Sequence, residues 1–286
     1  MIDNSNDKYN IGDNIFNAFF VKNFIGQGKS SKVYEVKNQI GLTSAIRVFD
    51  KNIKINENFI QKLIKFRSNR LISIENFGLT TKGENCILME YEKHNLNNFE
   101  YPIEEHLACR YFSGILKGLK ILHDNSFIHT NIKPSNLFYS NMIKISDSGL
   151  YEYIVHKDNI KYDIYDLYFK PPEFFQNQKN NIYSDLWASC VLFYYMLTNK
   201  FPFYGKDKNQ IYEAIINNNI DYDIIPETYR KFLLKCFQLD PYNRFANSKD
   251  LNDNFIKISK QTSPSKSKRT FRKRIKKIRS GCIGCL

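Results

Sequence analysis

The sequence lacks an apolar run long enough to cross a membrane. A membrane span needs roughly 18 or more consecutive apolar residues, and the longest candidate, residues 187–197, contains Ser189 and two tyrosines. This segment therefore predicts a buried helix. Wholesale disorder is excluded, because 42% of the 286 residues are apolar and 15% are aromatic, enough to form sizeable cores. At roughly 150 residues per domain, the length predicts about two packed units.

An export signal is also missing. Residues 1–14 are polar and acidic, without the basic start and apolar stretch of a secretory signal peptide. We therefore expect a cytoplasmic protein whose six cysteines are reduced. Cys86, Cys109, Cys190 and Cys236 each stand alone in apolar surroundings, which is typical of core thiols.

Acidic residues are absent from the last part of the chain. Residues 254–286 contain no Asp or Glu but eleven Lys or Arg. Because the whole chain carries a formal net charge of +13, removing these eleven leaves +2 for residues 1–253. The composition therefore predicts a nearly neutral globular body with a strongly basic tail.

Two kinds of patterning follow one another along the body. Short β-branched or aromatic runs between Gly, Asn and Ser breaks come first and predict strands, at 19–24, 32–37, 45–49, 71–77 and 86–91. Amphipathic or apolar stretches predict helices, at 56–66, 107–122, 182–197, 208–217 and 226–237. Mostly strands first and helices second predict an α+β fold of two lobes with a cleft between them.

A glycine-rich turn stands between the first two predicted strands. Gly26 and Gly28 lie in Ile-Gly-Gln-Gly-Lys-Ser-Ser-Lys-Val, and glycines permit a tight turn whose backbone N–H groups can approach phosphates. Alone, such a turn is also typical of ordinary hairpins. It gains force from the ordered motifs that follow: Ala45-Ile46-Arg47, Met89-Glu90-Tyr91, His129-Thr130-Asn131-Ile132-Lys133-Pro134-Ser135-Asn136, Asp147-Ser148-Gly149 and Pro171-Pro172-Glu173.

This order of motifs resembles the eukaryotic protein kinase family, with a texture closest to the calcium/calmodulin-dependent type. The resemblance runs from about residue 19 to about residue 259. It implies the two-lobed protein kinase fold, with a strand-rich lobe at 19–91 and a helical lobe at 93–259. A polar extension would then occupy residues 1–18, and a basic, cysteine-containing tail residues 260–286.

Several family positions are matched. The resemblance implies a nucleotide site whose residues are Gly26, Gly28, Val33, Ala45, Arg47, Met89, Glu90 and Tyr91. It also implies that Asn136 and Asp147 are metal ligands. ATP and Mg²⁺ are thus the implied cofactors, with the alternative that these residues persist only as packing. Two structural anchors are implied as well: Asp185 would hold the catalytic loop, and Arg244 would pair with Glu173.

Departures from the family concern the chemistry. Asn131 replaces the Asp that accepts the substrate proton, and losing a general base typically costs about 10²–10⁴ in rate. Arg47 replaces the strand Lys, whose ammonium a planar guanidinium does not imitate. Phe59 occupies the position of the Glu that pairs with that Lys, leaving Glu57 as the nearby acidic substitute. Ser148 replaces an apolar Phe and should loosen the active arrangement.

One departure suggests compensation. Counting back from Glu173, Asp166 falls where the family has a Thr that contacts the catalytic loop, here Asn131 and Lys133. We hypothesise that Asp166 restores a carboxylate beside Lys133, either balancing charge or acting as a displaced base. The alternative is an unrelated loop Asp. A separation above roughly 6 Å, beyond close charge-pair range, would remove the hypothesis.

The tail has a pattern of its own. Apolar residues recur among the basic ones at the spacing of an amphipathic helix, at Phe271, Ile275, Ile278, Cys282 and Cys285. Cys282 and Cys285 beside a polybasic run fit S-palmitoylation, so membrane attachment is the preferred interpretation. Calmodulin binding, nuclear targeting or nucleic-acid binding through 266–277, a Cys-x-x-Cys metal or redox pair, and a solvated tail without function stay open.

Three functions are therefore carried forward. The preferred one is a pseudokinase that acts as an ATP-binding or scaffolding regulator of protein partners. The second is a weak serine/threonine protein kinase that transfers the γ-phosphoryl group of ATP to protein hydroxyls. The third is a membrane- or nucleic-acid-targeted module in which the tail directs the kinase-like domain to its location.

Overall fold

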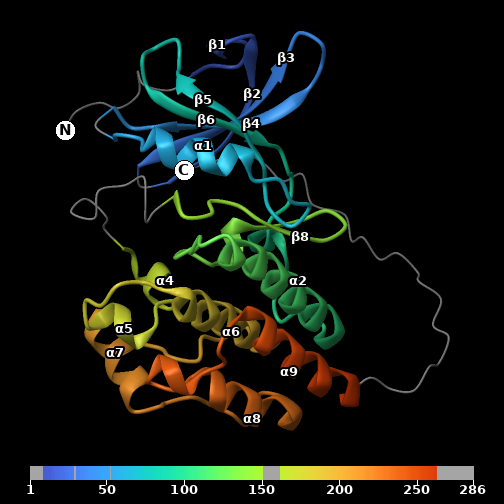
Figure 1. The fold of residues 1–286 in the computed structure, drawn as a ribbon, viewed down its shortest axis with the longest axis vertical. Coiled ribbons are helices and arrows are strands. Elements are labelled where there is room, and N and C mark those ends of the chain that lie inside the picture. The colour runs from blue at the N-terminus through green and yellow to red at the C-terminus, as the bar shows by residue number, and fades with distance from the viewer. Residues whose placement is uncertain (1–8, 29, 52, 151–161, 263–286) are drawn as a thin grey trace, which may run out of the picture.

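Two lobes are stacked along the long axis of the molecule, one built on a β-sheet and one on helices (Figure 1). The structure is a computed structural model that describes residues 9–28, 30–51, 53–150 and 162–262. The predicted two-lobed α+β architecture is confirmed. Separate hydrophobic cores fill the sheet lobe and the helical lobe, and a third apolar cluster lies beneath helix α1.

The sheet of the first lobe has six antiparallel strands in the order β1-β2-β3-β4-β6-β5. Each of the five predicted strands is present, with shifted ends. The strands are β1 (Asn14–Phe16), β2 (Phe19–Gln27), β3 (Ser31–Asn38), β4 (Thr43–Phe49), β5 (Ile74–Leu79) and β6 (Asn85–Glu90).

Residues 9–18 differ from the expected loose extension. Ile15 and Phe16 are buried in the core of the sheet lobe, and the Tyr9 hydroxyl donates a hydrogen bond to the Glu84 carboxylate at 3.0 Å. A strand of three residues is too short to show the alternation that reveals strands in a sequence. The first lobe therefore begins before residue 19.

Helix α1 (Glu57–Lys65) covers one face of this sheet (Figure 1). Asn56 caps it, because its side chain accepts a hydrogen bond from the Phe59 backbone N–H at 3.2 Å. Phe59, Ile60 and Leu63 form its buried face. They pack in one cluster with Ile87 of β6 and with Leu150, which follows the Asp-Ser-Gly motif.

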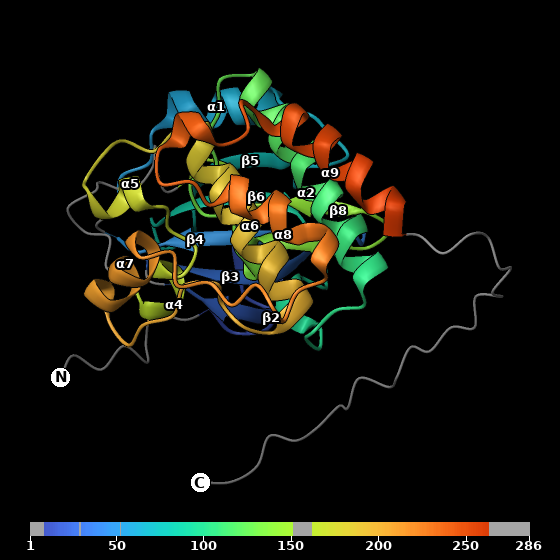
Figure 2. The ribbon, with the colours of Figure 1, turned by 90° about the horizontal axis from the view of Figure 1, so that it is seen from below.

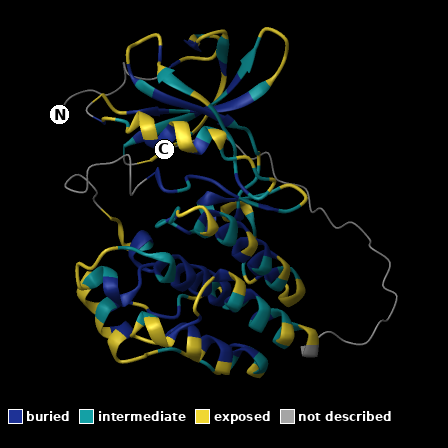
Figure 3. Ribbon diagram, viewed as in Figure 1, coloured by how far each residue is buried: buried dark blue, intermediate teal, exposed yellow. Residues whose placement is uncertain are grey.

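The second lobe is a helical bundle around α6, whose ribbon is almost entirely buried (Figure 3). Helices α2 and α9 lie side by side in both views (Figures 1 and 2). Within the described residues, no helix combines the length and apolarity of a membrane span. The α-helices are α2 (Glu105–Asp124), α4 (Ile164–Leu167), α5 (Pro172–Phe175), α6 (Ile182–Thr198), α7 (Lys208–Ile216), α8 (Glu227–Cys236) and α9 (Ser248–Thr262).

A short hairpin on the helical lobe carries the central motifs. Strands β7 (Leu137–Tyr139) and β8 (Ile143–Ile145) pair antiparallel, directly after the 3₁₀ turn η3 (Pro134–Asn136). The backbone N–H of Ile72 donates to the Ile145 carbonyl at 2.8 Å. This contact joins the segment before β5 to the hairpin, so both lobes meet beside the Asp-Ser-Gly motif.

Candidate functional site

The pairing of strands β2, β3, β4 and β6 brings together several residues of the predicted nucleotide site. Gly26 of β2 lies opposite Val33 of β3, and Val33 in turn lies opposite Arg47 of β4. Ala45 lies opposite Met89 at the end of β6. Because paired residues point to the same face of a sheet, these side chains gather on one surface. Gly28 closes the turn through a hydrogen bond from its N–H to the Ser31 carbonyl at 2.8 Å.

Arg47 reaches across to the Asp-Ser-Gly motif. Its Nη2 donates to both carboxylate oxygens of Asp147, each at 2.7 Å, and its Nη1 donates to the Ser31 hydroxyl at 3.1 Å. The side chains of Arg47 and Asp147 are only 13% and 4% exposed. A charge-assisted pair shielded from water is stronger than an exposed one, so Asp147 is firmly engaged.

Helix α1 offers Arg47 no carboxylate from its buried face. Phe59 is buried there and packs edge-on against Phe127, with ring centroids 5.6 Å apart. Glu57 is exposed in the first turn. Arg47 therefore pairs with Asp147 and not with Glu57, the partner suggested from the sequence.

The catalytic loop is held by Asp185 at the start of α6, as predicted. Its carboxylate accepts hydrogen bonds from the backbone N–H groups of His129 at 2.8 Å and Thr130 at 2.7 Å, and His123 Nε2 lies 2.9 Å away. Burial opposes ionisation of Asp185, but these hydrogen bonds and His123 lower its pKa below the ordinary value. A buried carboxylate thus fixes the loop that carries Asn131.

Asn131 stands where the resemblance places the base, and its side chain is a neutral amide. Its backbone carbonyl accepts from the Asn136 side-chain amide at 2.8 Å, and its backbone N–H donates to His129 Nδ1 at 3.1 Å. Within the part of the chain that the structure describes, the side-chain amide of Asn131 forms no hydrogen bond with another side chain. A neutral amide oxygen is too weak a base to take a hydroxyl proton near neutral pH.

Asp166 lies beside Lys133, as the compensation hypothesis requires. The Lys133 Nζ donates to Asp166 Oδ1 at 2.7 Å, well within close charge-pair range. Asp166 belongs to α4, whose cap Asp163 accepts a hydrogen bond from the Asp166 N–H at 2.8 Å. The side chain of Asp166 is 9% exposed. The structure therefore brings together a lysine and a carboxylate that are 33 positions apart.

The two predicted metal ligands sit at one end of the β7–β8 hairpin. The Ser146 N–H donates to the Asn136 carbonyl at 2.9 Å, which places Asn136 close to Asp147. Mg²⁺ prefers oxygen ligands in near-ideal octahedral geometry. Both carboxylate oxygens of Asp147 accept from Arg47, so an ion at this position would share the carboxylate with the guanidinium.

The segment that links the two lobes, residues 90–92, is held in place by contacts of its acidic side chains. Lys144 of β8 forms ion pairs with Glu90 and, at 2.8 Å, with Glu92, and Glu90 also accepts from the Ser73 N–H at 3.3 Å. The Tyr91 hydroxyl donates to Glu35 at 3.4 Å. The Glu90 side chain is thereby occupied, which leaves backbone groups as this segment's means of contacting an adenine.

A pocket opens behind Met89. Met89 and Ile87 of β6, Leu63 of α1 and Ser148 line it. The short Ser148 side chain stands where the resemblance expects a Phe, so it adds little apolar packing between α1 and the Asp-Ser-Gly motif.

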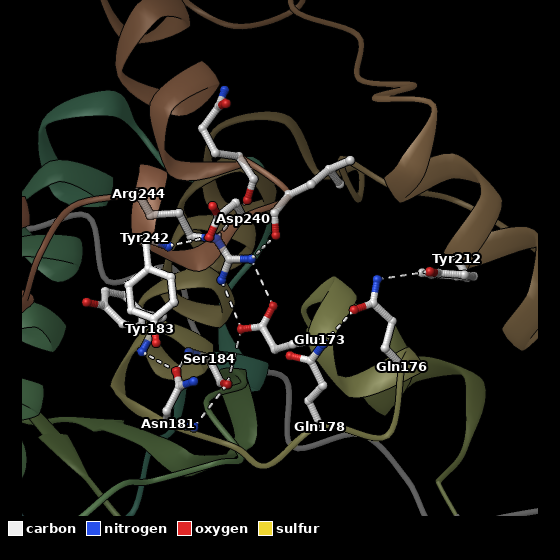
Figure 4. Close-up of polar contacts among 12 residues, drawn as sticks. Glu173, Gln176, Gln178, Asn181, Tyr183, Ser184, Tyr212, Asp240, Tyr242 and Arg244 are labelled. Atoms are coloured by element: carbon white, nitrogen blue, oxygen red, sulfur yellow. Dashed lines mark hydrogen bonds and ion pairs between the residues drawn. The ribbon is translucent and has the colours of Figure 1, made fainter.

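The helical lobe contains a buried ion pair between Arg244 and Glu173 (Figure 4). Arg244 Nη2 lies 2.8 Å from Glu173 Oε2 and Nη1 lies 3.0 Å from Oε1; both side chains are 3% exposed or less. The guanidinium also lies over the Trp187 ring, 4.7 Å from its centroid. The predicted pair of Glu173 and Arg244 is therefore present, and it anchors α5 to the turn at η5 (Pro241–Asn243).

Two contacts had no clear signal in the sequence. Lys170 is buried, and its Nζ donates to the Thr130 carbonyl at 2.9 Å, which brings a cation to the loop from the segment before α5. The Ser31 hydroxyl accepts a hydrogen bond from Arg47, a role that the sequence did not indicate. Neither position stands out by residue type or spacing, because each depends on segments that meet only in the fold.

A model of the protein kinase domain matches residues 19–256. The chain belongs to the eukaryotic protein kinase family. Solved structures support the kinase fold: the crystal structure of Rad53 in complex with AMP-PNP matches 84% of this chain and 65% of that chain, with a TM-score of 0.71 at 23% identity.

Known protein kinases are similar in sequence to most of this chain. Aurora kinase of Saccharomyces cerevisiae is 28% identical over 77% of the chain and 64% of its own length. Calcium-dependent protein kinase 6 of Plasmodium berghei is 27% identical over 80% of the chain and 16% of its own length. The chain thus spans less than two thirds of these relatives. Because identities to different kinds of kinase are similar, the calcium/calmodulin-dependent subgroup stays a prediction.

Proposed function

We propose that this kinase homologue is a pseudokinase, a kinase fold that regulates or scaffolds protein partners and transfers phosphate poorly. The observation that carries the proposal is the pair of Arg47 with Asp147. The carboxylate that family members use for the metal is bonded through both oxygens to a guanidinium. The guanidinium supplies the positive charge at this carboxylate. The affinity for a nucleotide bound beneath the sheet would therefore depend little on Mg²⁺.

Asn131, at the position of the family's base, also supports the proposal of poor phosphate transfer. Kinases turn over at about 1–100 s⁻¹, and loss of the base by a factor of about 10⁴ leaves roughly 10⁻⁴–10⁻² s⁻¹. Asn131 removes the base, while Arg47 engages Asp147 and Phe59 replaces the carboxylate of the regulatory helix. These losses affect one catalytic unit and are not additive, so the range above is the expected ceiling.

The test is phosphotransfer by the full-length protein with ATP and Mg²⁺, using a randomised Ser/Thr peptide library as acceptor. The proposal expects turnover below about 10⁻² s⁻¹. An Asn131→Asp variant serves as the matched comparison, because it restores the base and nothing else. Steady transfer near ~1 s⁻¹, the low end for kinases, by the unmodified protein would refute the proposal.

A weak serine/threonine kinase is the second candidate, favoured by the carboxylate of Asp166 beside Lys133. If Asp166 acts as a displaced base, residual transfer should fall at least about 100-fold in Asp166→Asn. If it only balances the charge of Lys133, the variant should lose stability while any residual transfer per folded molecule stays unchanged. The two roles are thus separable in one variant.

Targeting through the tail is a further proposal. Residues 263–286, including Cys282 and Cys285, lie outside the described residues. Deletion of 263–286 should release the protein from anionic vesicles if the polybasic run binds them, at about 1 kcal/mol per basic residue. Acylation predicts retention that survives high salt, whereas nucleic-acid binding predicts a steep loss with salt.

A further inference from the structure

A second cavity lies on the helical lobe, apart from the residues of the nucleotide site. It encloses about 290 Å³ between α2, the β7–β8 turn and the segment before β5. Small-ligand pockets occupy roughly 300–1,000 Å³, so its volume is at the lower end of that range. Its basic residues come from two segments: Arg70 precedes β5, and Arg110 and Lys117 belong to α2.

The geometry of α2 brings these cations together. Arg110, Gly114 and Lys117 stand at positions i, i+4 and i+7, which share one face of a helix. A Cβ at Gly114 would lie 3.2 Å from Cβ of Ile143 and 3.6 Å from Nη1 of Arg70. The missing side chain therefore lets β8 pack against the helix and lets the Arg70 guanidinium lie over the same face.

No carboxylate balances this charge. None of the residues that line the cavity is Asp or Glu, and within the described part of the chain Arg70, Arg110 and Lys117 form no ion pair. Arg110 donates only to a neutral group, the Asn141 carbonyl, at 3.1 Å. Three cations that converge on one concavity repel one another, and a bound anion would remove that repulsion.

We infer that this cavity binds the phosphate of a phosphorylated serine or threonine on a partner protein. A phosphomonoester carries close to two negative charges and three acceptor oxygens, and arginine forks bind phosphate oxygens in pairs. Arg110 and Lys117 are exposed and Arg70 is half-buried, so a short phosphorylated side chain reaches all three. The half-buried Tyr139 ring packs on the buried Tyr111 ring, with centroids 4.9 Å apart, and both residues line the cavity.

The test uses the full-length protein and a fluorescent peptide library with a central phosphoserine and randomised flanks. Selected peptides should bind the wild type and should lose affinity when dephosphorylated, when inorganic phosphate is added, or when salt is raised. Arg110→Ala and Lys117→Ala should each weaken binding at least about tenfold, as expected for a hydrogen bond to a charged group. Lys120→Ala is the matched control, because Lys120 lies on α2, pairs with Asp124 and does not line the cavity.

Three outcomes would overturn the inference. One is a library without phosphate-dependent binders. A second is selected peptides that bind the Arg110→Ala/Lys117→Ala protein as tightly as the wild type. The third is binding through these residues to vesicles containing phosphatidylinositol phosphates but to no peptide, which would assign the cavity to a lipid. Both substituted residues are exposed on the helix, so equal thermal midpoints for variant and wild type show that the fold persists.

Discussion

Arg47 Nη2 lies 2.7 Å from both carboxylate oxygens of Asp147, across 100 positions of sequence. The contact joins strand β4 of the sheet lobe to the segment after β8 in the helical lobe. It holds the lobes together at the point where a kinase would place metal-bound nucleotide. The ion pair that the family forms between strand and helix within the sheet lobe is thus replaced by an interlobe pair between the strand and the predicted metal ligand.

Arg47→Lys should restore a metal response. Lysine has a single nitrogen and cannot bond to Ser31 and Asp147 through separate groups as the guanidinium does. Displacing a hydrogen bond to a charged group costs roughly 1.5–3 kcal/mol. We therefore expect Mg²⁺ to tighten nucleotide binding at least about tenfold more in the variant than in the wild type, by isothermal titration calorimetry. Arg230→Lys, at a pair whose partner Asp223 is 91% exposed, should change nothing; an equal Mg²⁺ response in all three proteins would count against the role of Arg47.

Asp166→Asn should destabilise the protein by about 1–3 kcal/mol, because Lys133 would keep its charge in a partly buried site without its carboxylate. Urea unfolding of both proteins measures the difference. Asp253→Asn provides the control, since its pair with Lys249 is exposed and exposed pairs contribute little to stability. Equal losses in the two variants would show that the Lys133 pair has no special weight.

Glu173→Gln should lower the free energy of unfolding by more than Asp166→Asn does. The carboxylate and its partner Arg244 are both almost fully buried, and removing one member of a buried pair typically costs about 3–5 kcal/mol. The guanidinium over Trp187 would then remain charged without its counter-ion. Urea denaturation checks the value, and a loss below about 1 kcal/mol, typical of surface pairs, would contradict the importance of this anchor.

Acid should weaken the catalytic loop through His129. Its Nε2 lies 2.6 Å from the Ser146 carbonyl, to which it donates, and its Nδ1 accepts from the Asn131 N–H, so both nitrogens are satisfied in the neutral ring. Burial lowers the pKa of His129 below 6.5, although Asp185 opposes the shift. The unfolded chain therefore binds the proton first.

The stability that the neutral ring contributes is complete above about pH 6.5. It falls as the pH drops toward the lower pKa of the folded protein, by at most about 1.4 kcal/mol per pH unit. Urea unfolding at pH 7.5 and 5.5, with NMR titration of the imidazole, measures this loss. A His129 ring that titrates above pH 6.5 in the folded protein would contradict it.

Much of the fold followed from periodicity and order. The five predicted strands and the central helices are present because their apolar residues repeat at the spacing of the element. The pair of Lys133 with Asp166 was also predictable, since motif spacing fixed both positions. Strand β1 and helix α9 were not predicted. Strand β1 has only three residues, and the apolar residues of α9 are sparse among polar ones.

Remote contacts that no motif position indicated could not be predicted from the sequence. Arg47 was expected to need a carboxylate from α1, but Phe59 fills the buried face of that helix and the next available acid is Asp147. The basic cavity gathers Arg70 and Arg110 from segments 40 positions apart in the sequence. Nothing in either segment marks the residue as a partner of the other until the hairpin and α2 pack together.

The most direct test of the account is a calorimetric titration of the wild-type protein with the ATP analogue AMP-PNP, in EDTA and in saturating Mg²⁺. If Arg47 holds the carboxylate of Asp147, the two dissociation constants should agree within about threefold, which corresponds to less than 1 kcal/mol. Binding that tightens about tenfold or more with Mg²⁺, a change of at least 1.4 kcal/mol, and that is lost in Asp147→Ala would contradict the central claim.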